Sequence, residues 1–309
     1  RHGPRQVNLK KHLARYLLGA ACVLVFLGHG ARVWQLPFVS LLDAYLYDVR
    51  VRLSAPGTQD DRIVIVDIDE KSLSEVGRWP WGRDVLAQLV KKLTDEYRVS
   101  VLGFDVVFAE PDESSGLKVL EKLGREQLRG EKAYQEALPA LRTSLNYDRL
   151  FAETLKGRPV VLGYYFSGID DARRSGALPA PVWPAGHLAR RPDTLLDWKG
   201  YGGNLPELQK NAASAGHFNP VVDFDGVSRR VPLVVRHDGN YYEALALAMV
   251  RQLLGGAVLK PGYPDAGSGM EWLEVGGERS GMRIPVDEIG AALIPFRGGE
   301  RSFPYVSAA

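Results

Sequence analysis

The 309-residue sequence is poor in features that assign a chain to a common enzyme class. It contains a single cysteine, Cys22, so an intrachain disulfide is excluded. Its 39 basic and 37 acidic residues nearly balance, and no basic stripe interleaved with aromatic residues occurs, which argues against nucleic-acid binding. The P-loop, the HExxH helix of zinc proteases and the GxSxG elbow of serine hydrolases are also missing. A serine nucleophile therefore has no support.

The amino terminus carries the signal of a membrane anchor. An apolar run at residues 16–27 follows a cluster of basic residues: Arg1, Arg5, Lys10, Lys11 and Arg15. Extended to 13–38, and tilted, the run provides the roughly 20 residues that a spanning helix needs. The basic cluster predicts a cytoplasmic segment at 1–12, a transmembrane helix at 13–38 and an exported remainder at 39–309. The alternative is a cleaved signal peptide, but no clear A-x-A site follows the run.

A second amphipathic segment follows the membrane run. Its apolar residues recur at helical spacing and are Leu41, Leu42, Tyr45, Leu46, Val49 and Leu53. Ala55-Pro56-Gly57 ends the pattern. We predict a helix over 39–55, which is either a stalk that pairs with a second copy or a short helix packed on the following domain.

The stretch 62–112 predicts a parallel βαβ unit. Continuous β-branched residues at 62–68 are typical of a strand buried on both faces. An apolar stripe at 85–97 predicts a helix, and 99–108 predicts the second strand. Acidic residues follow both strands, and the carboxyl edge of an open parallel sheet is where ligands tend to bind.

The remainder predicts further helices and short strands. Residues 114–146 have a helix-favouring composition and predict a protruding helical insertion. A third buried strand at 159–166, a hairpin-like turn at 223–226, a helix at 241–254 and strands at 270–275, 282–285 and 292–296 follow. The predicted fold class is α/β: a mixed sheet with a parallel βαβ core and antiparallel C-terminal hairpins, preceded by an N-terminal transmembrane helix.

The acidic strand ends supply most of the candidate site. The candidate ligand-binding residues are Asp67, Asp69, Trp79, Trp81, Arg83, Asp105, Glu110, Asp112 and His217. Clustered carboxylates fit a divalent cation, a general acid–base pair or, with the tryptophans, a pocket for a small cationic or polar ligand. Aspartates at strand ends also cap helices and pair with arginines, and we favour this structural role over a metal. We predict no cofactor and no catalytic residue in this chain.

His217 stands alone in AGHFNP, without a second histidine at metal-ligand spacing. We interpret it as a loop histidine with satisfied hydrogen bonds rather than as a ligand. Its ordinary pKa of about 6.5 nevertheless makes it the natural place for pH sensing.

A succession of motifs resembles the CHASE2 family. In order over residues 40–309 they are Asp48-x-Arg50, IVIVDIDEKSL, GRWPWGR, VLGFDVVFAEPD, Asp148-x-x-Phe151-Ala152, VVLGYYF, AGHFNPVVDFDGVSRRVPLV, EALALAMV, IPVDEIG and IPFRGGERSFPYVSAA. The resemblance implies an extracytoplasmic sensor domain of a bacterial membrane receptor. It also implies a cytoplasmic output, commonly an adenylate or guanylate cyclase and sometimes a histidine kinase, a serine/threonine kinase or a diguanylate cyclase. The insertion at 114–146 is longer than the family pattern requires.

We therefore expect a receptor module in the bacterial inner membrane, with a cytoplasmic N-terminus and a periplasmic or extracellular domain. Its expected partners are the membrane, a second copy in a homodimer and an unknown small-molecule or physical stimulus. The chain begins at Arg1 rather than Met and stops soon after Tyr305, which predicts a piece of a longer class III nucleotide cyclase. The rivals are an exported metal-dependent hydrolase that uses the acidic edge and a purely structural membrane assembly domain.

Overall fold

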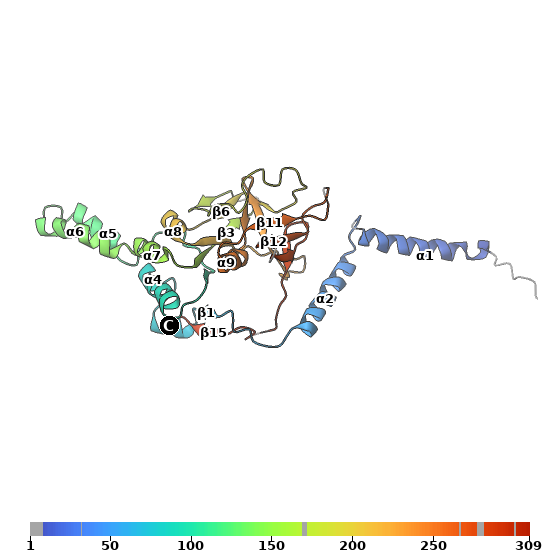
Figure 1. The fold of residues 1–309 in the computed structure, drawn as a ribbon, viewed down its shortest axis with the longest axis horizontal. Coiled ribbons are helices and arrows are strands. Elements are labelled where there is room, and N and C mark those ends of the chain that lie inside the picture. The colour runs from blue at the N-terminus through green and yellow to red at the C-terminus, as the bar shows by residue number, and fades with distance from the viewer. Residues whose placement is uncertain (1–8, 32, 169–171, 266, 277–280, 300) are drawn as a thin grey trace, which may run out of the picture. The chain divides into compact units, whose positions relative to one another are not determined.

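The structure is a computed structural model, and it describes residues 9–31, 33–168, 172–265, 267–276, 281–299 and 301–309. The chain divides into two compact units. The first comprises the chain up to Asp60 together with Pro295–Ser302, and the second comprises Asp61–Ile294 and Phe303–Ala309. Figure 1 labels many of their helices and strands.

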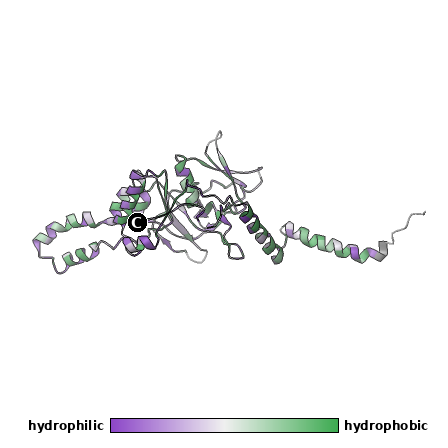
Figure 2. Cartoon of the chain, turned by 90° about the horizontal axis from the view of Figure 1, so that it is seen from below, coloured by the Kyte–Doolittle hydropathy of each residue, from purple (hydrophilic) through white to green (hydrophobic). Residues whose placement is uncertain are grey.

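The first unit contains the helices α1 (Leu9–Gly30) and α2 (Pro37–Ser54). The span His12–Gly30 is long and apolar enough to cross a membrane. A helix of the 22 residues of α1 is about 33 Å long, and the hydrocarbon core of a bilayer is about 30 Å thick. Figure 2 shows green, apolar turns along α1.

The predicted membrane helix over 13–38 is interrupted. α1 ends at Gly30 and Pro37, which lacks a backbone N–H, begins α2. Between the two helices, Trp34 Nε1 donates to the Val25 carbonyl over 2.9 Å, and Leu36 N donates to His29 Nδ1 over 3.1 Å. These bonds turn the connecting segment back along the end of α1.

The core of the second unit is a parallel sheet centred on β3. Its strands are β2 (Leu102–Phe104), β3 (Val160–Ser167) and β7 (Ser214–His217), and β3 pairs in parallel with both neighbours. The helices before β3 are α5 (Leu117–Arg125), α6 (Lys132–Leu145) and α7 (Tyr147–Leu155). The helix before β7 is α8 (Pro206–Asn211).

The two faces of this sheet are covered differently, because consecutive strand residues point to opposite sides. On one side Phe104 meets Phe151 of α7 edge to face, with ring centroids 6.1 Å apart. On the other side α9 (Leu245–Leu253) comes so close that a Cβ on Gly216 would lie 2.5 Å from the Leu245 backbone. Only glycine fits this position of β7.

The first predicted strand does not join the parallel sheet. β1 (Ile65–Asp67) pairs in parallel with β15 (Tyr305–Ser307) in a separate two-stranded sheet, so the predicted pairing of 62–68 with 99–108 is wrong. Ile63 and Val64 are 57% and 49% exposed. The apolar run is therefore not buried on both faces, and its partner lies at the far end of the sequence.

Three helical elements connect β1 to β2. They are α3 (Glu70–Glu75), α4 (Arg83–Lys91) and the π-helical turn η1 (Lys92–Glu96) that continues α4. α4 packs against α7. α5 and α6 pack against each other within the segment 114–146.

Short, mostly antiparallel strands complete the second unit, which has the predicted mixed α/β class. They form the pairings β3–β6–β4, β10–β9–β5, β14–β8 and β11–β12–β13. The bounds are β4 (Arg174–Ser175), β5 (Asp197–Trp198), β6 (Gly200–Gly202), β8 (Arg230–Pro232), β9 (Val234–His237), β10 (Asn240–Glu243), β11 (Leu259–Gly262), β12 (Trp272–Val275), β13 (Met282–Pro285) and β14 (Ala291–Leu293).

Two buried apolar clusters hold the unit together. One surrounds β3 and includes Leu86, Phe151 and Leu162, and the other lies around β12 and includes Val234 and Leu273. All five side chains are at most 1% exposed.

Candidate functional site

The predicted acidic edge is divided between two groups of contacts. One is centred on Arg83 at the start of α4, and the other on Asp69 at the start of α3. Asp105 and Glu110 are exposed. The structure therefore does not gather the predicted carboxylates into one pocket.

Arg83 is the centre of the first group. It is 9% exposed, and its guanidinium lies 4.5 Å above the Phe108 ring. Its Nε is 3.5 Å from Asp148 Oδ1, and its backbone N donates to Asp112 Oδ2 over 2.6 Å. Asp148 Oδ2 accepts the backbone N–H of Asp112 over 2.8 Å. Asp112 thus caps α4, while Asp148 of α7 fixes the loop that carries Asp112.

Burial sets the charges in this group. Desolvation lowers the pKa of Arg83 against the opposing effect of Asp148 and Asp112, but an arginine keeps its proton in proteins. Desolvation also raises the pKa of Asp148, partly offset by the Asp112 hydrogen bond and by Arg83. For Asp112, desolvation acts upward, but hydrogen bonds from Arg83 and Ser114 outweigh it and leave the pKa below its usual range. The group links α4, α7 and the loop that carries Asp112 through one buried arginine and two carboxylates.

The two tryptophans face the core. Trp81 is 5% exposed, and its Nε1 donates to the Gly77 carbonyl over 2.8 Å. Trp79 lies edge to face against it, with ring centroids 5.7 Å apart, and packs on the cluster around β3. Neither tryptophan is among the residues that line the hollow beside Asp287 or the hollow beside α8.

Asp69 joins the two ends of the second unit. Its Oδ1 accepts the backbone N–H of Ser72 over 2.8 Å, which caps α3, and also accepts the Ser307 hydroxyl of β15 over 2.8 Å. The bonds from Ser72, then the bond from Ser307, lower the pKa of Asp69. The carbonyl of Asp67 accepts the N–H of Ala308 over 2.9 Å, while the Asp67 residue itself is exposed. We call Asp69, Ser72 and Ser307 the clasp.

His217 lies in β7 rather than in a loop, so that interpretation is wrong. It is fully buried beside Tyr164 and Phe166, with its ring centroid 5.8 Å from that of Phe166. Within the described residues neither ring nitrogen has a hydrogen-bond partner, and neither does the Tyr164 hydroxyl. Desolvation lowers the pKa of His217 to about 3 and raises that of Tyr164 well above its ordinary value.

Sequence reasoning treated Asp223-Phe224-Asp225-Gly226 only as a turn, but the structure makes it part of an ion network. Arg229, 5% exposed, holds Asp225 with two bonds of 2.9 and 2.7 Å and Asp223 with one of 3.1 Å. Arg230 joins Asp223 to Asp287. The hydrogen bonds from Arg229 lower the pKa of Asp225 to about 2. The sequence feature that could have revealed this network is Arg229-Arg230, the pair of arginines that follows the turn.

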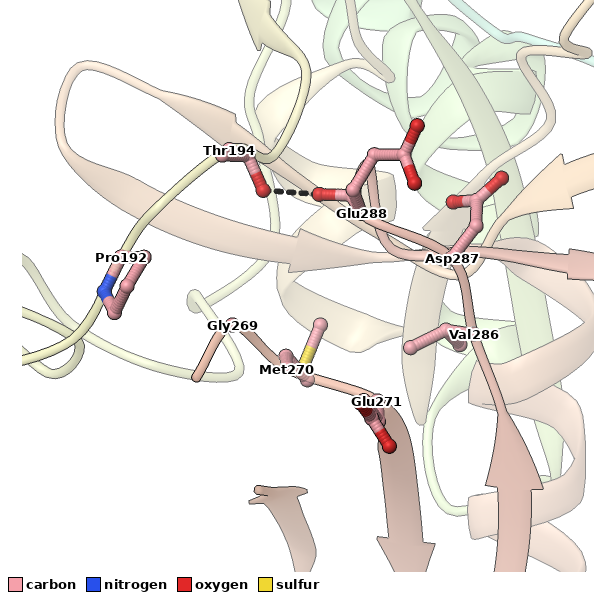
Figure 3. A pocket seen from close by; sticks show the side chains of 8 residues that line it. All are labelled: Pro192, Thr194, Gly269, Met270, Glu271, Val286, Asp287 and Glu288. Atoms are coloured by element: carbon pink, nitrogen blue, oxygen red, sulfur yellow. Dashed lines mark hydrogen bonds between the residues drawn. The ribbon is translucent and has the colours of Figure 1, made fainter. Parts of the chain in front are cut away.

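An open hollow lies beside this network and shares Asp287 with it (Figure 3). It measures about 540 Å³ and is lined by Pro192, Thr194, Gly269, Met270, Glu271, Val286, Asp287 and Glu288. The Thr194 hydroxyl donates to the Glu288 carbonyl across its rim. No sequence-predicted site residue lines it. In the part of the chain that the structure describes, no group of three or more His, Cys, Asp and Glu side chains is arranged to hold a metal.

These features define a mixed α/β domain joined to a helix able to span a membrane, with its buried charges used as braces. The family model of the CHASE2 domain matches residues 19–309, so the chain belongs to the CHASE2 family. CHASE2 domains are extracytoplasmic sensors, and the apolar helix α1 fits a single-pass membrane protein. No curated protein and no solved structure matches the chain.

Proposed function

We propose that the chain is the extracytoplasmic sensor of a bacterial transmembrane receptor that controls a cytoplasmic adenylate or guanylate cyclase. The observation that carries this proposal is the match to a sensor family over residues 19–309, which includes most of a helix suited to span a membrane. The basic residues before α1 and in its first turns support a cytoplasmic N-terminus in the bacterial inner membrane. A histidine kinase or a serine/threonine kinase is the alternative output.

The proposed receptor is a homodimer that pairs through α2. Among the side chains described, α2 has none buried. Phe38, Leu41, Leu42, Tyr45 and Leu46 are 48–62% exposed and recur at helical spacing. A second copy would remove this apolar stripe from water, and pairing of subunits is what class III cyclases and many kinases need for activity.

The stimulus acts by binding one of two conformations of the domain more tightly than the other. We place a small-molecule stimulus in the hollow of Figure 3, because Arg83, Asp112 and Asp69 are committed to braces and the two predicted tryptophans face the core. The carboxylate of Glu271 on its rim favours a cationic or polar ligand, whereas that of Asp287 is already paired with Arg230.

The orientation is tested by labelling a single introduced cysteine. Replacing the lone Cys22 by alanine and introducing Gly130→Cys puts one thiol at a position open enough that a Cβ meets nothing within 4 Å. We expect an impermeant maleimide to label it in intact spheroplasts. Labelling only after permeabilisation contradicts an extracytoplasmic domain.

The output is tested in membranes that contain the full receptor. We expect formation of cyclic AMP or cyclic GMP that changes with Leu42→Arg, which places a charge in the α2 stripe, and not with Asp43→Asn as the control. Autophosphorylation without cyclic nucleotide would favour the kinase alternative. The hydrolase alternative requires a bound metal that the double variant Asp67→Asn/Asp105→Asn loses. Metal analysis of the native chain and of the double variant therefore tests it, and a native chain without metal contradicts it.

A further inference from the structure

The sheet formed by β1 and β15 is incomplete. Within the described residues β15 has β1 as its sole strand neighbour. An isolated pair of strands is marginally stable, and an open edge is a template for pairing with another strand.

The register shows which backbone groups of β15 face outward. Ile65 N donates to the Pro304 carbonyl, and Ala308 N donates to the Asp67 carbonyl, each over 2.9 Å. In a parallel ladder the groups that face the partner belong to alternate residues, here Pro304, Val306 and Ala308. The backbone N–H and C=O groups of Tyr305 and Ser307 therefore point to the open edge.

The open edge carries apolar side chains and no charge. Tyr305 and Val306 are 58% and 53% exposed. Ile63 and Val64, in the segment just before β1, are also exposed, at 57% and 49%. The segment 303–309 reads FPYVSAA and contains no lysine, arginine, aspartate or glutamate. Charged side chains are the usual protection of an edge strand, and β15 lacks them.

We infer that the open edge of β15 docks the same edge of a second copy of this chain. Two identical strands can pair the backbone N–H and C=O groups of their open edges when they run antiparallel about a two-fold axis. Because β15 carries no charged side chain, it meets its copy without like-charge repulsion. The inference rests on the homodimer proposed above and adds a second contact to it. A three-residue strand is far below the roughly 800 Å² per partner of a stable interface, so this contact works together with the α2 stripe.

One antiparallel register pairs the outward groups of Tyr305 with those of Ser307, so that it uses both residues of each strand. Tyr305 of one copy opposes Ser307 of the other and exchanges both backbone hydrogen bonds with it, and Val306 meets Val306 of the second copy on the axis. That central pair is not hydrogen bonded, so its Cα atoms lie about 4.5 Å apart. This separation falls within the range of about 4.4–6.8 Å that a disulfide bridges.

Disulfide crosslinking in membranes tests the inference on the full chain with Cys22→Ala. Val306→Cys should form a disulfide-linked dimer under mild oxidation. Val64→Cys is the matched control, because Val64 is a similarly exposed valine just before β1 and lies away from the axis. We expect at least about a tenfold higher dimer yield for Val306→Cys, and Tyr305→Pro, which removes an outward N–H, should suppress it without unfolding the domain.

The outcomes separate this contact from the dimer itself. Equal crosslinking of Val306→Cys and Val64→Cys, with efficient crosslinking of Leu42→Cys in α2, overturns the β15 contact and leaves the proposed homodimer intact. A yield for Val306→Cys that persists with Tyr305→Pro also overturns it. Absence of crosslinking at all three positions, with a monomeric mass by light scattering, overturns both.

Discussion

His217 should make the second unit sensitive to acid. Its imidazole is fully buried with both nitrogens unpartnered, and desolvation lowers its pKa to about 3. In the unfolded chain a histidine has a pKa of about 6.5. Because the folded-state value is the lower one, the unfolded state takes up the proton first. The folded state therefore keeps its full free energy of unfolding above about pH 6.5, and loses the contribution of neutral His217 as the pH falls toward about 3.

The size of the effect follows from the two pKa values. Each pH unit between them is worth about 1.4 kcal/mol, so acidification from pH 7.5 to 4.5 should cost about 3 kcal/mol through His217. Glu243, a buried neighbour on β10, has a pKa raised by desolvation and acts with the opposite sign. Tyr164 and Tyr242 stay neutral over this range, since desolvation raises their pKa values.

Replacing His217 by glutamine removes one titration and leaves the others in place. Urea unfolding of the detergent-solubilised chain, followed by tryptophan fluorescence, gives the free energy of unfolding at pH 7.5 and 4.5. The His217→Gln protein should lose about 3 kcal/mol less than the native chain between these pH values. His187→Gln is the control, because His187 is exposed and stacks on Trp183. Equal losses in the native and His217→Gln proteins would refute the reasoning.

Three further changes test the packing and the braces. Gly216→Ala places a methyl group 2.5 Å from the backbone of α9 and should lower the free energy of unfolding by about 1–3 kcal/mol, whereas Gly130→Ala, in open space, should leave it nearly unchanged. Arg83→Met leaves a buried carboxylate unpaired and should cost about 3–5 kcal/mol at pH 7.5 by urea unfolding, and part of the loss should return in acid as that carboxylate takes up a proton. Asp69→Ala removes the cap of α3 and the tie to β15, so amide exchange at residues 305–308 should accelerate, with exposed Asp105→Ala as the unaffected control.

Local pattern located most elements of the fold because their signals are local. The predicted strand at 159–166 is β3 (Val160–Ser167), and the predicted helix at 241–254 contains α9 (Leu245–Leu253). Local pattern could not predict the partner of β1, because β15 lies at the other end of the sequence. The bond between Asp69 and Ser307, which ties the two regions together, joins residues 238 positions apart. An apolar run shows that a strand forms, and only tertiary contacts decide which strand it joins.

The candidate site shows the same limit at the level of side chains. The sequence placed Arg83 and Asp112 near each other, but it did not show that Asp148 completes their group from α7. The tryptophans of WPW fit a ligand cleft and a packed corner equally well by composition, and burial decides for the corner. His217, alone in AGHFNP, was interpreted as a loop residue, whereas it lies in β7, where the neighbouring Gly216 allows the close approach of α9.

The pairing of β1 with β15 restricts how a signal can leave the domain. β1 is the first strand after α2, β15 is the last strand of the sequence, and the clasp bonds Ser307 to Asp69 over 2.8 Å. A slip of one residue along the ladder would turn every side chain of β15 to the opposite face and break the clasp. The motion of lower cost keeps the ladder intact and moves β1, β15 and α3 as one body. In the proposed receptor, a conformational change in the domain would then reach the segments before β1 and after β15 together, so loss of the clasp should uncouple the stimulus from the proposed output before it unfolds the domain.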